Sequence, residues 1–190
     1  MPNTSSVAAE NPMTKLPGDL AMWVIILAEL SVFAILFLVF AVQFSLNEEL
    51  FKQGQALLDT RAGLIITLAL LSASYFVAQA VAFFERNQPK YFALFLLAAC
   101  ASALVYVVVK LAEYNHLVEA GFGLSGNKFF TYYFLITGFH LLHVLLGMGI
   151  LIFVLFKRRH IGLHGLNTAA SYWHMVDLVW LVLFPILYLL

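Results

Sequence analysis

The sequence contains very little charge for its length. Of its 190 residues, 11% are charged and 63% are hydrophobic, and the mean hydropathy is +0.95. A soluble domain of this size has roughly a quarter of its residues charged and about half apolar. A globule this small leaves much of its surface in water and cannot hide the apolar excess. The composition therefore argues against a water-soluble enzyme and a disordered chain, and it indicates an integral membrane protein.

Cysteine is nearly absent, and neither sign of charge dominates. The single cysteine, Cys100, excludes an intramolecular disulfide and any site that requires two thiolates, such as a zinc ribbon, an iron–sulfur cluster or a paired copper centre. Ten basic residues balance ten acidic residues. Because a nucleic-acid partner would require a clustered basic excess, this balance argues against nucleic acid as a partner.

Five long apolar runs follow a short polar tail. The tail covers residues 1–16 and is rich in Ser, Asn, Pro and Thr, whereas residues 17–190 are predicted to form one domain. Each run has about 20 residues or more, the length that a helix needs to cross a ~30 Å hydrocarbon layer. The predicted fold is therefore an all-α bundle of five transmembrane helices. The predicted spans are about 20–44, 62–84, 91–113, 129–156 and 169–190.

Residues typical of helix starts precede the later runs. Pro89 occupies a first-turn position in the third run. The predicted caps are Asp59 or Thr60 for the second run, Asn127 for the fourth and Asn167–Thr168 for the fifth.

Residues 45–61, between the first two runs, are predicted to be a loop that lies on the membrane surface, because apolar side chains alternate there with charges.

Basic residues are distributed unequally between the two ends of the predicted helices. Lys and Arg are in excess on the cytoplasmic side of transmembrane proteins, which predicts a cytoplasmic amino terminus and a periplasmic carboxyl terminus. With this orientation the cytoplasmic side carries Lys15, Arg86, Lys90 and the cluster Lys157–Arg159, whereas the opposite side carries Lys52, Arg61 and Lys128.

Five ionisable residues are predicted to lie in the hydrocarbon layer, where each requires a partner or a function. Glu29 falls near the middle of the first span, His140 and His143 share a face of the fourth, and His174 and Asp177 share a face of the fifth. Similar depths predict an interhelical polar network in which a carboxylate fixes a histidine tautomer. The alternatives are axial ligation of a haem iron and a proton route, and for Glu29 a proton-accepting or lipid-contacting site.

Weaker patterns concern local packing. Lys110 and Glu113 are predicted to form an ion pair that is solvated or interfacial, with Lys110 extending outward from the third span. The aromatic residues at 129–130 and 132–133 are typical of the aromatic belt at a membrane interface. Three glycines of the fourth span are predicted to permit close helix approach: Gly138, Gly147 and Gly149. No metal-binding or catalytic residues are identified.

Two stretches resemble a known family. Residues 137–147 read TGFHLLHVLLG, and residues 171–180 read SYWHMVDLVW. The first is similar to the signature helix of subunit III of haem–copper oxidases, and the second is similar to the last helix of that subunit. Glu113-Tyr114, followed by a glycine-containing loop, resembles the entry to the signature helix. Glu29 falls where the family has a buried glutamate.

The resemblance implies an accessory subunit whose metals lie in a separate chain. The five-helix pattern and residues 16–23, LPGDLAMW, are most similar to the nitric oxide reductase E proteins. The expected partner is therefore the catalytic subunit of a nitric oxide reductase in a bacterial inner membrane, whose assembly, stability or proton and lipid environment the chain supports. The alternatives are subunit III of a cytochrome c or quinol oxidase and, further, a small b-type cytochrome. The resemblance implies no cofactor in this chain, haem and metal in the partner, and phospholipid as a further ligand.

Overall fold

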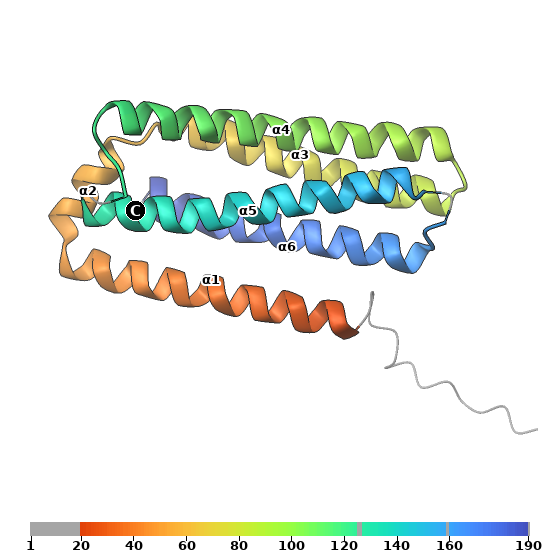
Figure 1. The fold of residues 1–190 in the computed structure, drawn as a ribbon, viewed down its shortest axis with the longest axis horizontal. Helices are drawn as coiled ribbons and strands as arrows, with labels where there is room; N and C mark the ends of the chain where they lie inside the picture. Colours follow the sequence, from red (N-terminus) through yellow and green to blue (C-terminus); the bar gives the residue numbers. More distant parts are fainter. Residues whose placement is uncertain (1–19, 125–126, 159, 190) are drawn as a thin grey trace, which may run out of the picture.

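The computed structural model describes residues 20–124, 127–158 and 160–189, and the predicted tail at 1–16 lies outside them. Within this part of the chain all six regular elements are α-helices (Figure 1). Five of them, all but α2, are long and apolar enough to cross a membrane, which confirms the predicted fold class. The helices are α1 (Leu20–Leu46), α2 (Glu48–Ala56), α3 (Thr60–Glu85), α4 (Pro89–Glu119), α5 (Lys128–Phe156) and α6 (Leu163–Tyr188).

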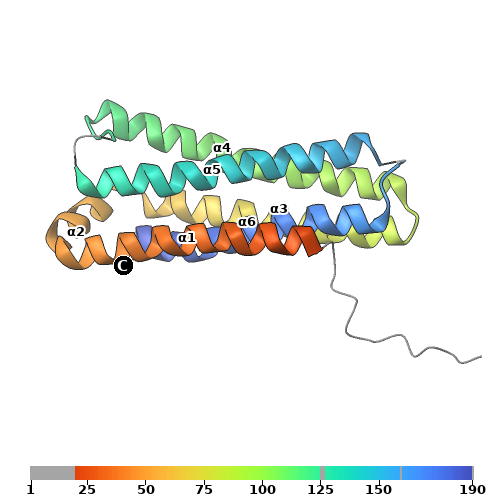
Figure 2. The same cartoon turned by 60° about the horizontal axis from the view of Figure 1, so that its bottom comes forward.

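Helices α3, α4, α5 and α6 form a four-helix group, and α1 lies along one side of it (Figures 1 and 2). Helix α3 packs against α4 and α6, and α5 also packs against both of these helices. Helix α1 contacts α5 and α6 and is the least buried of the five long helices. Its position makes the α1–α5 interface a boundary between the four-helix group and a more exposed helix.

Three of the predicted helix starts are confirmed. Asp59 Oδ1 accepts a hydrogen bond from the Arg61 N–H at 2.9 Å, and Asn127 Oδ1 accepts one from the Phe129 N–H at 3.0 Å. Pro89 is the first residue of α4. The predicted cap at residues 167–168 is wrong, because α6 already begins at Leu163 and both residues lie inside the helix.

The segment predicted to be a loop at residues 45–61 instead contains helix α2. Glu48 and Lys52 form an exposed ion pair at 2.6 Å on its outer side, and the neighbouring ammonium lowers the pKa of Glu48. Phe51 on the other side is fully buried against Phe40 and Phe129, with ring centroids 5.2 and 5.5 Å apart. Burial of this apolar side chain holds α2 across the end of the bundle.

The aromatic residues at the start of α5 are core residues. Phe129, Phe130 and Tyr133 are each 0% exposed, so their prediction as an interfacial belt is wrong. Helix α2 covers Phe129, and Phe122 in the α4–α5 connection stacks on Phe130 at 4.5 Å between ring centroids. The first turns of α5 therefore belong to the hydrophobic core, which α2 and this connection enclose at this end of the bundle.

The three glycines of α5 have different surroundings. A Cβ added at Gly147 would lie 3.0 Å from Cε3 of Trp173, so the absence of a side chain lets α6 approach. A Cβ at Gly138 or Gly149 would have no neighbouring atom within 4 Å. The prediction of helix packing is therefore wrong for these two. A comparable close approach, missed in the sequence, occurs at Gly63 in α3, against Phe184 and Tyr188.

The described basic residues separate between the two ends of the bundle. The α3–α4 turn, the α5–α6 connection and the start of α1 lie at one end, whereas α2 and the end of α6 lie at the other (Figure 1). Arg86, Lys90 and Arg158 belong to the first end. The assignment of this end to the cytoplasmic side remains a prediction from charge.

Candidate functional site: polar contacts between the helices

Glu29 of α1 contacts His143 of α5. The His143 Nε2 atom lies 2.9 Å from Glu29 Oε2, and His143 Nδ1 lies 2.8 Å from the carbonyl oxygen of Phe139. A carbonyl oxygen only accepts hydrogen bonds, so Nδ1 carries a proton and its N–H donates a hydrogen bond to the carbonyl oxygen of Phe139. The Nε2–Oε2 contact then requires one further proton, on the carboxyl of a neutral pair or on the imidazole of an ion pair.

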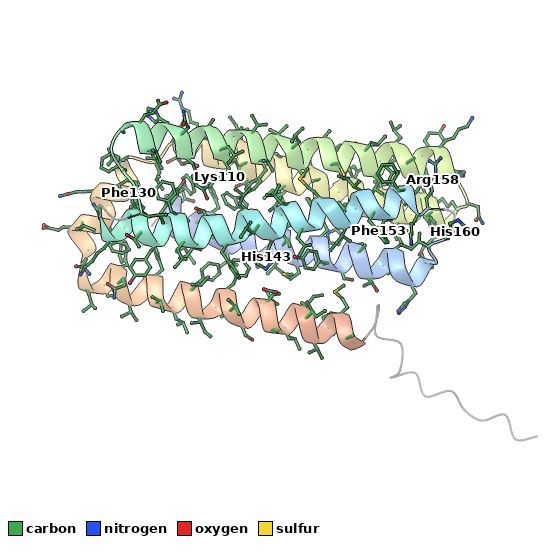
Figure 3. All side chains as sticks on the ribbon, in the orientation of Figure 1. Lys110, Phe130, His143, Phe153, Arg158 and His160 are labelled. Atoms are coloured by element: carbon green, nitrogen blue, oxygen red, sulfur yellow. The ribbon has the colours of Figure 1, made fainter. Side chains whose placement is uncertain are left out.

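This contact lies at the partly open boundary between α1 and the four-helix group (Figure 3). The His143 side chain is 10% exposed, whereas that of Glu29 is 31% exposed. Phe33 and Phe139 pack against the imidazole, with ring centroids 5.3 and 4.6 Å from it. The arrangement joins α1 to α5 through a pair of side chains that share a proton.

Replacement of Glu29 tests the role of this hydrogen bond. We expect Glu29→Ala to lower the free energy of unfolding by about 1–2 kcal/mol, because it leaves the His143 nitrogen without its partner. Glu29→Gln should cost less, because an amide N–H can donate to Nε2. Thermal unfolding of the purified full-length chain, combined with proteolysis between α1 and α3, measures both effects. Equal losses in the two variants would contradict a hydrogen-bonding role and favour a titrating one.

His140 does not join the predicted network. It is 0% exposed, and among the described residues neither of its ring nitrogens has a hydrogen-bond partner. Aromatic rings surround it instead: the centroids of Tyr106, Trp180 and Phe33 lie 5.7, 5.3 and 6.2 Å away. The three-residue spacing from His143 is compatible with a shared helix face, but His140 points into the four-helix group while His143 points toward α1.

His174 and Asp177 form a separate polar contact between α6 and α3. His174 is exposed, and its Nδ1 lies 3.4 Å from the hydroxyl of Ser74, which also interacts with Asp177. Asp177 is 6% exposed, and its Oδ1 atom has no hydrogen-bond partner among the described residues. Neither residue contacts Glu29 or His143 through a hydrogen bond in this part of the chain. The single predicted network is therefore divided into two separate contacts, one between Glu29 and His143 and one of His174 and Asp177 with Ser74. His140 belongs to neither contact and lies between aromatic rings.

Lys110 and Glu113 form a buried cluster, so the prediction of a solvated or interfacial pair is wrong. The exposed fractions of their side chains are 0% and 7%. Lys110 Nζ lies 2.9 Å from Glu113 Oε2, and it also contacts the hydroxyl oxygens of Tyr133 at 2.8 Å and Tyr188 at 2.9 Å. An ammonium has three N–H donors, and these three acceptors match them in number.

The cluster also satisfies the carboxylate. The Tyr188 hydroxyl lies 2.9 and 2.8 Å from the two oxygens of Glu113, which share its single O–H as acceptors. Lys110 Nζ lies 4.7 Å from the centroid of the Tyr133 ring and 5.5 Å from that of Trp180. Opposite charges, filled hydrogen-bond positions and aromatic faces compensate for burying an ion pair. The cluster thus joins α4, α5 and α6 without an unpaired charge.

Sequence reasoning missed the partners of these ionisable residues. Tyr188 lies 78 residues after Lys110, and Ser74 lies 100 residues before His174. Thr67 accepts a hydrogen bond from the indole N–H of Trp180 at 2.9 Å, across 113 residues. No local pattern marks any of these hydroxyl groups. Within the described residues, no group of three or more His, Cys, Asp or Glu side chains is arranged to hold a metal ion.

Comparison with known sequences identifies one family over almost the whole chain. The sequence model described as "Cytochrome c oxidase subunit III" matches residues 12–190. The match includes all six described helices and therefore every polar contact described above.

Named relatives belong to several oxidases. Probable quinol oxidase subunit 3 of Staphylococcus saprophyticus is 27% identical over 181 residues, which cover 91% of this chain and 89% of that protein. Cytochrome c oxidase subunit 3 of Synechocystis is 28% identical over 205 residues, covering 98% and 87%. Haem–copper oxidase subunit I+III of Aeropyrum pernix is 29% identical over 180 residues, covering 89% of this chain and 22% of that longer protein.

Proposed function

Since the chain belongs to the cytochrome c oxidase subunit III family, we propose that it is the accessory third subunit of a haem–copper terminal oxidase. The family match over residues 12–190 is the observation that carries this proposal. The chain is a multi-pass bacterial membrane protein with five membrane-crossing helices. In the proposed complex it stands beside the catalytic chain, which holds haem and copper.

The relatives support oxygen reduction more directly than nitric oxide reduction. The proteins from Staphylococcus saprophyticus and Synechocystis are named as subunits of a quinol oxidase and a cytochrome c oxidase. The Aeropyrum pernix protein is named as subunit I+III, so in that protein the matching region shares one polypeptide with subunit I. This supports a position next to the catalytic subunit for the present chain. The resemblance to nitric oxide reductase E proteins keeps a nitric oxide reductase as the second candidate partner.

The polar contacts suit a structural subunit better than a cytochrome. Axial ligation by two histidines requires two imidazole nitrogens that face each other across a space for the porphyrin. Aromatic rings enclose His140, His143 is bound to Glu29 and Phe139, and His174 lies on the outer surface. These residues do not form a pair around such a space. We therefore assign them to holding the helices together and, for Glu29 and His143, to the proton or lipid environment near the partner.

Deletion of the gene tests the proposal. Detergent extraction with a tagged chain should isolate a partner that contains haem, and the purified complex should reduce oxygen. Without the chain we expect lower turnover or a shorter active lifetime of the complex, because the catalytic chain loses a neighbour that covers its membrane surface. Oxygen and nitric oxide consumption are measured in parallel, each with quinol and with cytochrome c as donor.

Complementation with the intact gene is the control and should restore both turnover and lifetime. Nitric oxide consumption without oxygen consumption would select the second candidate partner. Unchanged assembly, turnover and lifetime in the deletion strain would contradict an accessory role with either partner. A Soret band in the purified isolated chain that disappears with His140→Ala or His174→Ala would instead support the b-type cytochrome alternative.

A further inference from the structure

One ionisable side chain is exposed in the middle of a membrane-crossing helix. Among the described His, Lys, Arg, Asp and Glu residues, His174 is the only one that is exposed in the middle third of a long helix. At 1.5 Å per residue it lies about 16 Å from the start of α6 and about 21 Å from its end. Lipid tails offer no hydrogen-bond partner at this depth. Because ionisable groups within membrane spans almost always pair inside protein, the exposed imidazole indicates that another protein covers it.

The contacts of His174 determine which hydrogen bond it still requires. Its Nδ1 lies 3.4 Å from the hydroxyl of Ser74, which also forms a hydrogen bond with Asp177. With Asp177 ionised, the hydroxyl donates its one proton to the carboxylate, and the hydroxyl oxygen accepts the N–H of Nδ1. The second nitrogen, Nε2, of a neutral imidazole with this tautomer is an acceptor, and it makes no hydrogen bond with another described residue. His174 therefore requires a donor from outside the chain.

The surface around His174 is apolar and extends over two helices. Leu178 and Leu181 continue the exposed side of α6 and are 53% and 43% exposed. On α3, Leu71 lies one turn before Ser74 and is 40% exposed. The other sides of α6 pack against α5 and α1. These residues, His174, Leu178, Leu181 and Leu71, define the α3–α6 face, an apolar surface with a hydrogen-bond acceptor at mid-depth.

We propose that the α3–α6 face is the surface on which the catalytic chain of the oxidase docks, and that a membrane helix of that chain donates a hydrogen bond to Nε2 of His174. This inference rests on the proposed function, which places a catalytic chain beside this one. Apolar side chains of such a helix cover the leucines, and a hydroxyl, amide or indole N–H binds the imidazole. Packing and hydrogen bonds of this kind associate helices within a membrane. The hydrogen bond also fixes the depth of the docked helix, which leucine contacts alone leave free to slide.

Photo-cross-linking in the intact complex tests the contact. With benzoylphenylalanine in place of Leu178, we expect irradiation to join the tagged full-length chain to the chain that contains haem. Leu104 of α4 is the matched control, because it is also a leucine near the middle of a long helix, is 52% exposed and lies outside the α3–α6 face. The control should give no such product. Equal yields from both positions would overturn the proposal, as would a product from position 178 that contains only a second copy of this chain.

Two variants of His174 test the hydrogen bond itself. We expect His174→Leu to weaken binding of the purified chain to the haem-containing chain from the deletion strain about fivefold, which corresponds to about 1 kcal/mol. His174→Gln should retain the affinity, because its amide oxygen accepts a hydrogen bond. Thermal unfolding of the isolated variants is the second readout and should not change. Unchanged affinity in His174→Leu would overturn the proposal, as would a loss of affinity that accompanies an equal loss of stability in the isolated chain.

Failure of the proposed function has a different result from failure of this inference. If no haem-containing chain co-purifies with the unmodified chain, both proposals are overturned. If the complex forms but position 178 gives no product with its haem-containing chain, the proposed function stands and the docking face is wrong.

Discussion

Replacing Lys110 by methionine is expected to lower the free energy of unfolding by about 3–5 kcal/mol. The substitution keeps the apolar stem of the side chain but leaves the Glu113 carboxylate buried without its positive partner. It also removes the ammonium N–H groups that donate hydrogen bonds to the hydroxyl oxygens of Tyr133 and Tyr188. Unfolding of the purified full-length chain in detergent, followed by tryptophan fluorescence, measures the loss.

A second substitution distinguishes the lost charge balance from lost packing. The double variant Lys110→Met/Glu113→Gln removes both charges, and the amide can still accept a hydrogen bond from Tyr188. We expect it to be more stable than either single variant, since replacing a whole buried pair costs less than removing one partner. A double variant as unstable as the sum of the single changes would show that the charges act independently.

The exposed ion pair in α2 is the control for this series. Like Lys110 and Glu113, Lys52 and Glu48 form a lysine–glutamate pair within one helix turn, but their side chains are 57% and 59% exposed. Lys52→Met should therefore change stability little, because solvent already screens that pair. If Lys52→Met and Lys110→Met had equal effects, the burial of the Lys110 cluster would be refuted.

Replacing Gly147 by leucine is expected to be the most disruptive change at the α5–α6 interface. The first added carbon alone would lie 3.0 and 3.3 Å from two atoms of the Trp173 ring and 3.6 Å from Tyr172. Trp173 is 1% exposed, so the added side chain has to displace a buried ring of the facing helix. Overpacking of this kind costs about 1–3 kcal/mol, and the remaining three carbons of leucine place the change at the upper end of that range.

The same helix offers a matched control two residues away. A side chain at Gly149 meets no atom within 4 Å, so Gly149→Leu should leave the unfolding midpoint almost unchanged. Because both substitutions remove a glycine from the interior of one helix, the difference between their midpoints isolates the clash from helix propensity. Loss of stability in Gly149→Leu equal to that in Gly147→Leu would place both residues in interfaces and contradict the observed packing.

The candidate polar site was predicted in part. Helical rise placed Glu29 and His143 at similar depths, and these two residues are in contact at 2.9 Å. His140 was included in the polar network because it shares a helix face with His143, whereas it lies among aromatic rings. The spacing of Lys110 and Glu113 predicted a solvated or interfacial ion pair, although Tyr133 and Tyr188 enclose Lys110. Depth along a helix follows from the sequence, but the direction of a side chain around the helix depends on its neighbours.

The sequence by itself determined that this is a bundle of five membrane-crossing helices and that it resembles subunit III of haem–copper oxidases. Both follow from linear information: length and apolarity fix the spans because backbone groups in lipid must be bonded within a helix, and ordered motifs identify a family. Only the tertiary structure decided which polar groups meet and which glycines adjoin a neighbour. It also decided that residues 48–56 form a helix that covers the end of the core. In a bundle where every helix is apolar nearly all round, the packing of neighbouring side chains sets the rotation of each helix, and no pattern within one segment encodes it.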